Sequence, residues 1–434
     1  MTTPPARPTP AVPVPPRPST GAPQPPYRLD PAGGCPHAAN AELLARGDVA
    51  PVVLPGEVPA MAVLGHEALK EFLNSPDVAK GDSHFTALRD GRIPEDWPLR
   101  AFASVPGMTT ADGTEHRRLR SPVTAAFTPR RVEALRPTIE AMTAGLLDDL
   151  ERAASDGDGT VDLRQDFALP LPLAVICELL GVDPEHRRRM HALSNRIVST
   201  DISPEEAGAA NADMVAALSA VVAARRADPG DDLTSALIAA AESDGGRLSE
   251  AELVGTLLLL IIAGHETTLN LIGNGIRALC AHRDQLRLVL DGQATWQDVV
   301  EETLRWDSPV SYFPFRYPTR DLTVDGTLIP AGTPVLAGYS AAGRDKAAHG
   351  PDADRFDITR TPNRHISFGH GPHFCLGSPL ARLEATVALE QLFTRFPGLE
   401  LTVAEAELPR HASFIGNGIQ HLLATLHTGA PAAR

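Results

Sequence analysis

Of the four cysteines in this sequence, Cys375 has the local sequence best suited to a reactive or metal-binding thiolate. Cys375 lies in the segment Phe368-Gly369-His370-Gly371-Pro372-His373-Phe374-Cys375-Leu376-Gly377, whose glycines permit tight turns and the close approach of another group. A helical pattern follows from Pro379 to Phe396, and the start of a helix stabilises a thiolate through its dipole and free N–H groups. Cys375 is therefore predicted to be the thiolate ligand of a haem iron, with a buried structural cysteine as the alternative.

A second group of polar residues interrupts a long apolar helix. A capping box at 249–252 predicts a helix that runs to about Cys280 and is apolar nearly all round from Leu253 to Ala263. The polar residues Gly264 to Thr268 then follow in mid-helix, where they cost stability, so they indicate a functional site or a local distortion. The segment nearly spells the zinc-protease motif H-E-x-x-H, but Leu269 stands at the second ligand position and cannot bind zinc.

Two further pairs of polar residues have helical spacing, one of opposite charge and one of two basic residues. Glu302 and Arg305 stand three apart, and His116 and Arg120 stand four apart, so each pair shares one face of a predicted helix. A carboxylate held between planar guanidinium groups forms a rigid clamp. Taken alone, the spacing of Glu302 and Arg305 is usually that of a solvated ion pair.

These segments together resemble the cytochrome P450 family. Phe368 to Gly377 resembles its haem-binding loop F-G-x-G-x-H-x-C-x-G at every fixed position, and Glu302 to Arg305 resembles its E-x-x-R helix. Arg355 resembles the arginine that completes the family's ion-pair triad with Glu302 and Arg305. The resemblance covers about residues 30–425 and implies the cytochrome P450 fold, with haem b (iron protoporphyrin IX) as cofactor and Cys375 as the iron ligand.

The resemblance also assigns the residues that surround the haem. Basic groups are expected at the two haem propionates, and the loop residues pack against the ring. The residues concerned are His116, Arg120, Arg316, Phe368, Gly369, His373 and Gly377.

The mid-helix cluster resembles the family's distal-helix motif. By that resemblance Thr267 holds the hydrogen-bond network where dioxygen is activated, Glu266 relays protons from solvent, and Gly264 leaves room above the iron. Protons must reach that point without flooding an apolar pocket, so a polar relay at one place in an apolar helix makes physical sense. Glu266 could instead simply pair with a nearby cation.

The implied activity is hydroxylation of a small apolar, multi-ring molecule by a monooxygenase. Segments such as Cys35 to Asn40, Pro94 to Leu99 and Pro309 to Arg316 resemble those of soluble actinomycete-type members, in a branch with steroid and macrolide hydroxylases. A steroid is the first candidate substrate, and a macrolide or related polyketide is the second. A haem-thiolate peroxygenase or dehydratase and a non-catalytic haem-binding protein are the other classes considered.

The expected substrate pocket is apolar. Family segments that form pocket walls supply candidate lining residues here, each of which could also be ordinary core. They are Phe85, Leu88, Phe102, Val105, Val198, Leu259, Ala263, Val310, Phe313, Phe414 and Ile415.

Electrons are expected from a separate protein, because the sequence contains no recognisable flavin, nicotinamide or iron–sulfur segment. A ferredoxin and its reductase are the implied partners, with O2 as co-substrate. The basic residues Arg117, Arg118, Arg130 and Arg131 are a candidate docking patch for an acidic ferredoxin.

The elements that position these residues are mostly helical. Apolar spacing predicts helices in 131–154, 171–180 and 210–226, while strand patterns are confined to 52–64 and 322–336. The expected fold is mainly α with a minor β-sheet region. We predict a proline-rich disordered arm at 1–26, one domain at 27–427 and a flexible tail at 428–434.

Composition limits the class of protein. The hydrophobic content of 43% and charged content of 21% are typical of a globular protein with a large core. A formal charge of −15 argues against nucleic-acid binding. The longest apolar stretch considered, Leu253 to Ala263, is short for a membrane span, and the four scattered cysteines fit reduced thiols. A cytoplasmic protein that does not bind membranes is expected.

Overall fold

The computed structural model describes residues 25–31, 33–183, 186, 188–190, 192–193, 196, 204–243 and 248–427. Of the predicted arm at 1–26, the structure describes Pro25 and Pro26, and the predicted tail at 428–434 lies outside the described residues. The expected domain boundaries therefore stay predictions. Val198, which was expected to line the substrate pocket, also lies outside the described residues.

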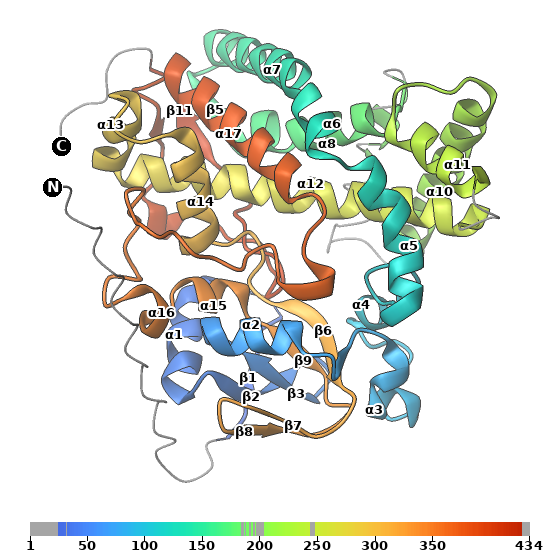
Figure 1. The fold of residues 1–434 in the computed structure, drawn as a ribbon. Helices are drawn as coiled ribbons and strands as arrows, with labels where there is room; N and C mark the ends of the chain where they lie inside the picture. The colour runs from blue at the N-terminus through green and yellow to red at the C-terminus, as the bar shows by residue number, and fades with distance from the viewer. Residues whose placement is uncertain are drawn as a thin grey trace, which may run out of the picture.

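Helices make up most of the described chain, as the apolar spacing predicts. They gather in one half of the molecule, with a few shorter ones beside the larger sheet in the other half (Figure 1). Their bounds are α1 Pro36–Arg46, α2 His66–Asn74, α3 Thr86–Arg89, α4 Arg100–Ser104, α5 Gly113–Ala126, α6 Pro129–Ala134, α7 Arg136–Asp156, α8 Pro170–Leu179, α10 Pro204–Ala227, α11 Leu233–Ser243, α12 Glu250–Ala281, α13 Arg283–Leu290, α14 Trp296–Trp306, α15 Tyr339–Gly343, α16 Lys346–His349 and α17 Ser378–Arg395.

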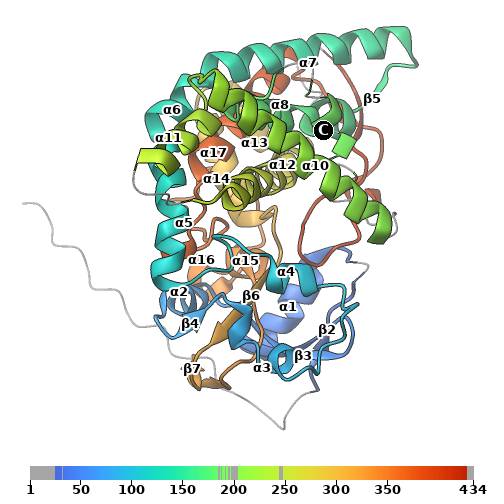
Figure 2. The same cartoon turned by 90° about the vertical axis from the view of Figure 1, so that its right-hand side faces the viewer.

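Helix α12 is the central element. Its predicted capping box forms: the Ser249 hydroxyl accepts a hydrogen bond from the Glu252 backbone N–H, and the Glu252 carboxylate accepts one from the Ser249 N–H. By length and composition the helix could cross a membrane, because its apolar part extends beyond the stretch from Leu253 to Ala263 that the sequence indicates. Half of its most apolar window is buried by the rest of the protein, and α10, α13, α14 and α17 surround it when it is viewed end-on (Figure 2). Its apolar character thus reflects a position in the core.

The expected helix at 131–154 is divided in two. Helix α6 ends at Ala134 and α7 begins at Arg136, with Pro137 in its first turn, where a missing N–H costs nothing. The predictions at 171–180 and 210–226 are confirmed as α8 and α10.

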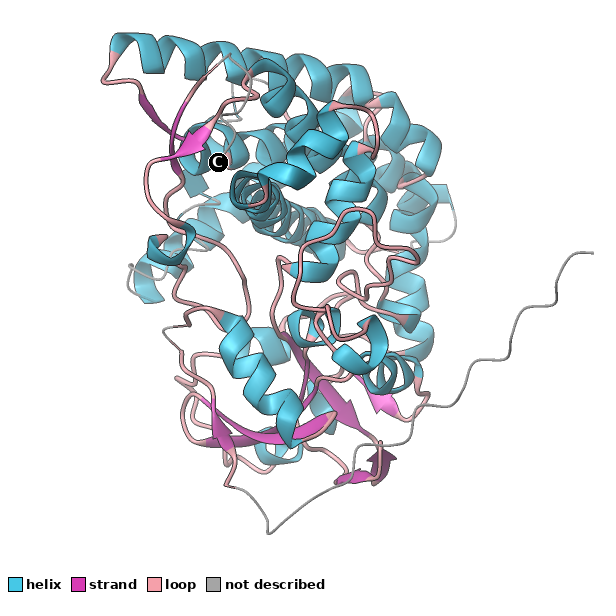
Figure 3. Ribbon diagram, turned by 90° about the vertical axis from the view of Figure 1, so that its left-hand side faces the viewer, coloured by secondary structure: helices cyan, strands magenta, loops and turns pink. Residues whose placement is uncertain are grey.

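The strands of the described residues form three sheets, whose strands are drawn in magenta in Figure 3. The larger sheet has the order β1-β2-β3-β9-β6-β4, the second has the order β10-β11-β5, and β7 pairs with β8. The bounds are β1 Tyr27–Arg28, β2 Val49–Leu54, β3 Val58–Val63, β4 Val78–Ala79, β5 Thr160–Asp162, β6 Phe313–Pro318, β7 Leu322–Val324, β8 Thr327–Ile329, β9 Val335–Ala337, β10 Glu400–Leu401 and β11 Leu423–Thr425.

The strand predictions hold in part. The segment 52–64 forms the antiparallel pair β2–β3, and 322–336 forms β7, β8 and most of β9. The turn between β7 and β8 has positive φ at Asp325 and Gly326, as a two-residue hairpin requires. Strands β1, β4, β5, β6, β10 and β11 were not predicted. All except β6 are two or three residues long and show no alternation that a pattern can detect, and β6 contains two prolines, which argue against a strand.

The fold places a cavity between the two halves. The largest apolar core cluster joins α7, α8, α12, α14 and α17, and two smaller clusters lie on either side of the larger sheet. Residues of α12 and α17 reach the cavity from the helical half, and residues of β6 and the segment after β4 reach it from the sheet half.

Candidate haem and catalytic site

The loop that carries Cys375 is tightly folded. The backbone N–H of Cys375 donates to the carbonyl oxygen of Phe368 at 2.9 Å, which closes the loop just before α17. Gly369 and Gly371 have φ values of 75° and 72°, in the region that favours glycine. A Cβ on Gly371 would lie 2.7 Å from the carbonyl oxygen of Leu73. The loop can therefore reach this position only with glycine at 371.

The thiol of Cys375 faces the cavity from the end of this loop. Its pKa is raised, because burial outweighs the backbone N–H groups of Gly377 and Ser378 and the positive charges of Arg120 and Arg382, which lower it. Those groups all favour the thiolate. The donors around Cys375 therefore suit a ligand that binds iron as an anion.

The cavity has a volume of about 260 Å³ and is mostly apolar. Helix α12 forms the wall opposite Cys375 through Leu259, Ala263, Gly264, Thr267 and Leu271. These positions are about one helical turn apart, so they lie on one face. A flat cofactor bound to Cys375 would lie between this face and the cysteine loop.

One end of the cavity is strongly basic. The rings of His116 and His373 lie 4.1 Å apart between centroids, and Arg120 donates to the carbonyl oxygen of Phe374. Within the described part of the chain, Nε2 of His116 and Nη1 of Arg316 are buried and have no hydrogen-bond partner. Burial, together with His116, Arg316, Lys80 and Arg120, lowers the pKa of His373 to about 2.

These observations test whether haem fits the residues present. Buried donors without acceptors and clustered positive charges call for an anion, and haem carries two carboxylates on one edge. Arg120, Arg316 and His373 line the same cavity as Cys375 and the apolar face of α12, and the ring of His116 packs against that of His373. The donor set and the cavity thus fit haem, with Cys375 as iron ligand and His116, Arg120, Arg316 and His373 toward its propionates.

The predicted ion-pair clamp forms, with one correction. The Glu302 carboxylate accepts from Arg305 at 2.6 and 2.8 Å, and both side chains are fully buried. Arg355 was expected to complete the clamp with its side chain, but it contributes its backbone carbonyl oxygen, which accepts from Arg305 at 2.8 Å. Its side chain is exposed, and the second guanidinium near Glu302 belongs to Arg360, at 3.8 Å.

The reason for this correction is local. The backbone N–H of Asp357 donates to Glu302 at 2.8 Å, so the chain around 355–357 presents its backbone to the clamp. Phe356 is buried, which leaves Arg355 in solvent.

The mid-helix cluster divides between two sides of α12. Gly264 and Thr267 line the cavity, and the Thr267 hydroxyl donates to the Ala263 carbonyl oxygen at 2.7 Å. Glu266 does not line the cavity: its carboxylate lies near Gly416, where a Cβ would be 3.5 Å from Oε1. Burial raises the pKa of Glu266, and the positive charge of Arg164 lowers it. Glu266 therefore stands one residue from Thr267, on the side away from the cavity.

The expected substrate-pocket residues are brought together only in part. Leu259, Ala263, Val310 and Phe313 line the cavity.

Other expected lining residues lie elsewhere. Phe85 is fully buried in the core beside the larger sheet, stacked on Tyr317 at 5.3 Å. Phe102 and Val105 are 49% and 45% exposed on and after α4. The remaining three, Leu88, Phe414 and Ile415, pack against the core cluster of the sheet half. Apolar character alone could not separate these environments.

The structure adds residues that sequence reasoning missed. Lys80 is buried and lines the cavity beside Arg316, although nothing in its local sequence indicates this. Glu384 lines it from α17, together with Gly377, Leu380 and Ala381. Glu384 lies at helical spacing from Gly377, Leu380 and Ala381, so its position on the cavity face of α17 could have been predicted from the sequence.

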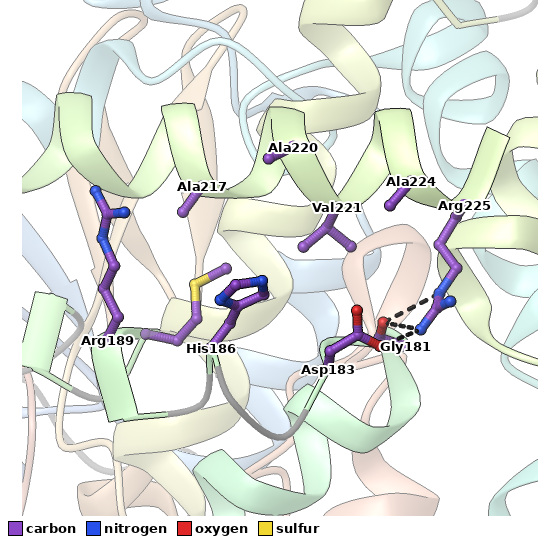
Figure 4. A pocket seen from close by; sticks show the side chains of 10 residues that line it. Gly181, Asp183, His186, Arg189, Ala217, Ala220, Val221, Ala224 and Arg225 are labelled. Atoms are coloured by element: carbon purple, nitrogen blue, oxygen red, sulfur yellow. Dashed lines mark hydrogen bonds and ion pairs between the residues drawn. The ribbon is translucent and has the colours of Figure 1, made fainter. Parts of the chain in front are cut away.

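A second cavity, of about 120 Å³, lies between α10 and the turn after α8 (Figure 4). Arg225 closes one side, donating to the Gly181 carbonyl oxygen and to Asp183 at 3.1 Å. These contacts join α10 to the turn, so the polar groups here have a structural role.

Comparison with known proteins agrees with this geometry. The model of the family "Cytochrome P450" matches residues 295–411. The chain is 41% identical over 394 residues to 2-hydroxy-5-methyl-1-naphthoate 7-hydroxylase of Streptomyces carzinostaticus, covering 91% of this chain and 95% of that one. It is 42% identical over 332 residues to 6-deoxyerythronolide B hydroxylase of Saccharopolyspora erythraea, covering 76% and 80%.

A solved structure shows a similar level of sequence identity to this chain. Testerone-bound CYP154C4 from Streptomyces sp. ATCC 11861 superposes with a TM-score of 0.88 at 43% identity, covering 93% of this chain and 99% of that one. The similarity extends over nearly the whole chain, and the chain therefore belongs to the cytochrome P450 family of monooxygenases.

Proposed function

We propose that this chain is a haem b monooxygenase that hydroxylates an apolar, multi-ring small molecule, with a steroid as the first candidate. The observation that carries the proposal is the cavity that holds Cys375 on one wall and Thr267 on the opposite wall, with a basic end beside them. Haem, when bound, supplies the activation of dioxygen, and the chain supplies the ligand, the proton path and the substrate pocket.

Each site residue then has a specific task. Cys375 ligates the iron as a thiolate, and His116, Arg120, Arg316 and His373 bind the propionates, while Phe368, Gly369 and Gly377 shape the loop.

On the opposite wall, Thr267 holds a hydrogen-bonding hydroxyl at the cavity, and Gly264 leaves space beside it. Glu266 takes up protons on the far side of α12, where Arg164 is the nearby cation. This division keeps water out of the apolar pocket while a proton can still reach Thr267.

A steroid suits the walls because Leu259, Ala263, Val310 and Phe313 present apolar surface with few polar anchors. The similarity to Testerone-bound CYP154C4 supports this choice. The similarity to 6-deoxyerythronolide B hydroxylase supports a macrolide as the second candidate. Retention of both Thr267 and Glu266 favours a monooxygenase over a peroxygenase or a non-catalytic haem-binding protein.

The electron donor we propose is a ferredoxin with its reductase, acting on a cytoplasmic protein. In the suggested docking patch, Arg118 pairs with Glu115 and Glu252, and Arg131 pairs with Asp231 at 3.2 Å. Arg117 and Arg130 are exposed and are the better candidates. Reversing both charges should slow reduction by ferredoxin in a salt-dependent way, and unchanged rates would exclude the patch.

Visible difference spectra test the proposal. The reduced carbon monoxide complex should show the red-shifted Soret band of a thiolate ligand, and Cys375→Ala should abolish it. Titration with steroids and macrolides should produce a low-to-high-spin shift with the class that binds. A histidine-type band in the native protein would overturn the assignment of Cys375, and a thiolate band without any spin shift would overturn the substrate ranking.

A further inference from the structure

Lys80 is a buried lysine at the edge of the haem cavity. It follows β4, is 4% exposed and donates from Nζ to the carbonyl oxygen of Pro314 at 3.2 Å. The ammonium also lies 5.0 Å from the centre of the Phe313 ring. An ammonium has three donors, and within the described chain these contacts use one of them on an oxygen. A buried cation with spare donors needs an anion.

The nearest carboxylate is already engaged. Asp112 accepts from the backbone N–H of Lys80 at 2.8 and 3.0 Å and from that of Gly81 at 2.8 Å. These bonds fix the backbone beside the cavity and leave the ammonium to point elsewhere. Lys80 lines the same cavity as Arg120, Arg316 and His373.

Among the described residues at this end, the positive charges of Lys80, Arg120 and Arg316 exceed the negative charge of Asp112, and burial raises the pKa of Glu384, which also lines the cavity, well above its usual value. Burial lowers the pKa of Lys80 well below its usual value, and Arg316 lowers it further, while Asp112 raises it. The cationic groups Lys80, Arg120 and Arg316 therefore converge on one region. Two carboxylates would offset two of these three positive charges, and haem carries two on one edge.

We propose that Lys80 is a further anchor of the haem, whose ammonium donates a charge-assisted hydrogen bond to a propionate of the bound cofactor. The inference rests on the proposed function, because it requires that this cavity holds haem. The propionate supplies the missing anion, so Lys80 stays protonated in the complex. A carboxylate on a substrate has the same chemistry, and the experiment below separates the two sources.

The first measurement is haem loss from the substrate-free holoprotein to an excess of apomyoglobin. Lys80→Met keeps the apolar stem and removes the charge, and Lys80→Gln keeps a neutral donor. Lys70→Met is the matched control, because Lys70 is exposed on α2. A hydrogen bond to a charged group predicts haem loss about tenfold to hundredfold faster in K80M, a smaller increase in K80Q and the native rate in K70M.

The second measurement replaces the cofactor. Haem dimethyl ester lacks both propionate charges, so native protein and K80M reconstituted with it should lose it at equal rates. If K80M accelerates loss of the ester as much as loss of haem, Lys80 acts by packing and the inference is wrong. The reduction potential gives a readout independent of haem loss: it should fall in K80M, because a positive charge near the iron favours the reduced state.

Failure of the inference differs from failure of the proposed function. A native protein without haem, or without a thiolate-type spectrum, would refute the proposed function. A native protein with that spectrum, in which K80M and K70M behave alike, would refute the role of Lys80 alone. An effect of K80M seen only in the affinity for carboxylate substrates would also refute it, and would assign Lys80 to the substrate.

Discussion

A buried pair of histidines should make the folded protein sensitive to mild acid. His349 lies at the end of α16 and its ring meets that of His66 edge-on at 5.0 Å. Its Nε2 lies 3.0 Å from the carbonyl oxygen of Ala342, so the neutral ring donates there. Burial, together with His66 and Arg305, lowers the pKa of His349 from 6.5 to about 4, against the weaker influence of the Ala342 carbonyl and Asp345. Burial also lowers the pKa of His66. The positive charge of Lys70 lowers it as well, whereas the carboxylates of Glu67 and Asp345 raise it.

The sign and size of the effect follow from these values. The unfolded chain takes up a proton at His349 below pH 6.5, whereas the folded protein resists until about pH 4. Stability is therefore lost as pH falls through this range, and the loss reaches at most about 3 kcal/mol. Between pH 7 and pH 5, His349 alone should lower the free energy of unfolding by about 2 kcal/mol.

The assay is urea unfolding followed by circular dichroism at pH 7, 6 and 5. His349→Gln keeps a donor for Ala342 but cannot be protonated, so its free energy of unfolding should fall by about 2 kcal/mol less than that of the native protein. His427→Gln changes an exposed histidine and should follow the native curve. Parallel pH dependence of H349Q and native protein would refute the reasoning, whatever their stabilities at pH 7.

Four further substitutions test packing and charge by urea unfolding at pH 7. Glu302→Gln leaves the buried Arg305 without its anion and should cost about 3 kcal/mol, and a loss under 1 kcal/mol would show that the clamp is not needed for stability. Gly343→Ala places a Cβ against the Arg305 carbonyl oxygen and should lower the free energy of unfolding by about 2 kcal/mol or more. Gly273→Ala, which has open space around it in α12, should instead raise it by about 0.5–1 kcal/mol. Equal effects of the two substitutions would contradict the geometry. Ser249→Ala removes the side-chain cap of α12 and should cost about 1 kcal/mol, and no change would mean that the capping box contributes nothing.

The parts of the fold that could be predicted are those fixed by local sequence. The capping box and the apolar run of α12 contain the information for that helix, and the glycines around Cys375 contain the information for its loop. The motif in 368–377 is long enough to indicate the family by itself. Membership in the family is confirmed by the comparisons, whereas the roles of individual site residues stay proposals.

The parts that could not be predicted depend on contacts between distant segments. Arg355 and Arg360 are both arginines near a buried carboxylate, and only the path of the backbone decides which guanidinium faces Glu302. Phe85 and Phe313 are both phenylalanines in expected wall segments, yet one stacks in the core on Tyr317 and the other lines the cavity. Residue type alone cannot distinguish these positions.

The distribution of charge connects the fold to the cofactor. The chain carries a formal charge of −15, yet it gathers Lys80, Arg120 and Arg316 at one end of a buried cavity. Gathering cations in a poorly hydrated place destabilises the protein unless an anion joins them. Two propionates supply such an anion, so folding of this region and haem binding should reinforce each other. The same imbalance explains why Lys80 looked ordinary in the sequence: its role depends on Arg120 and Arg316, which come from α5 and β6.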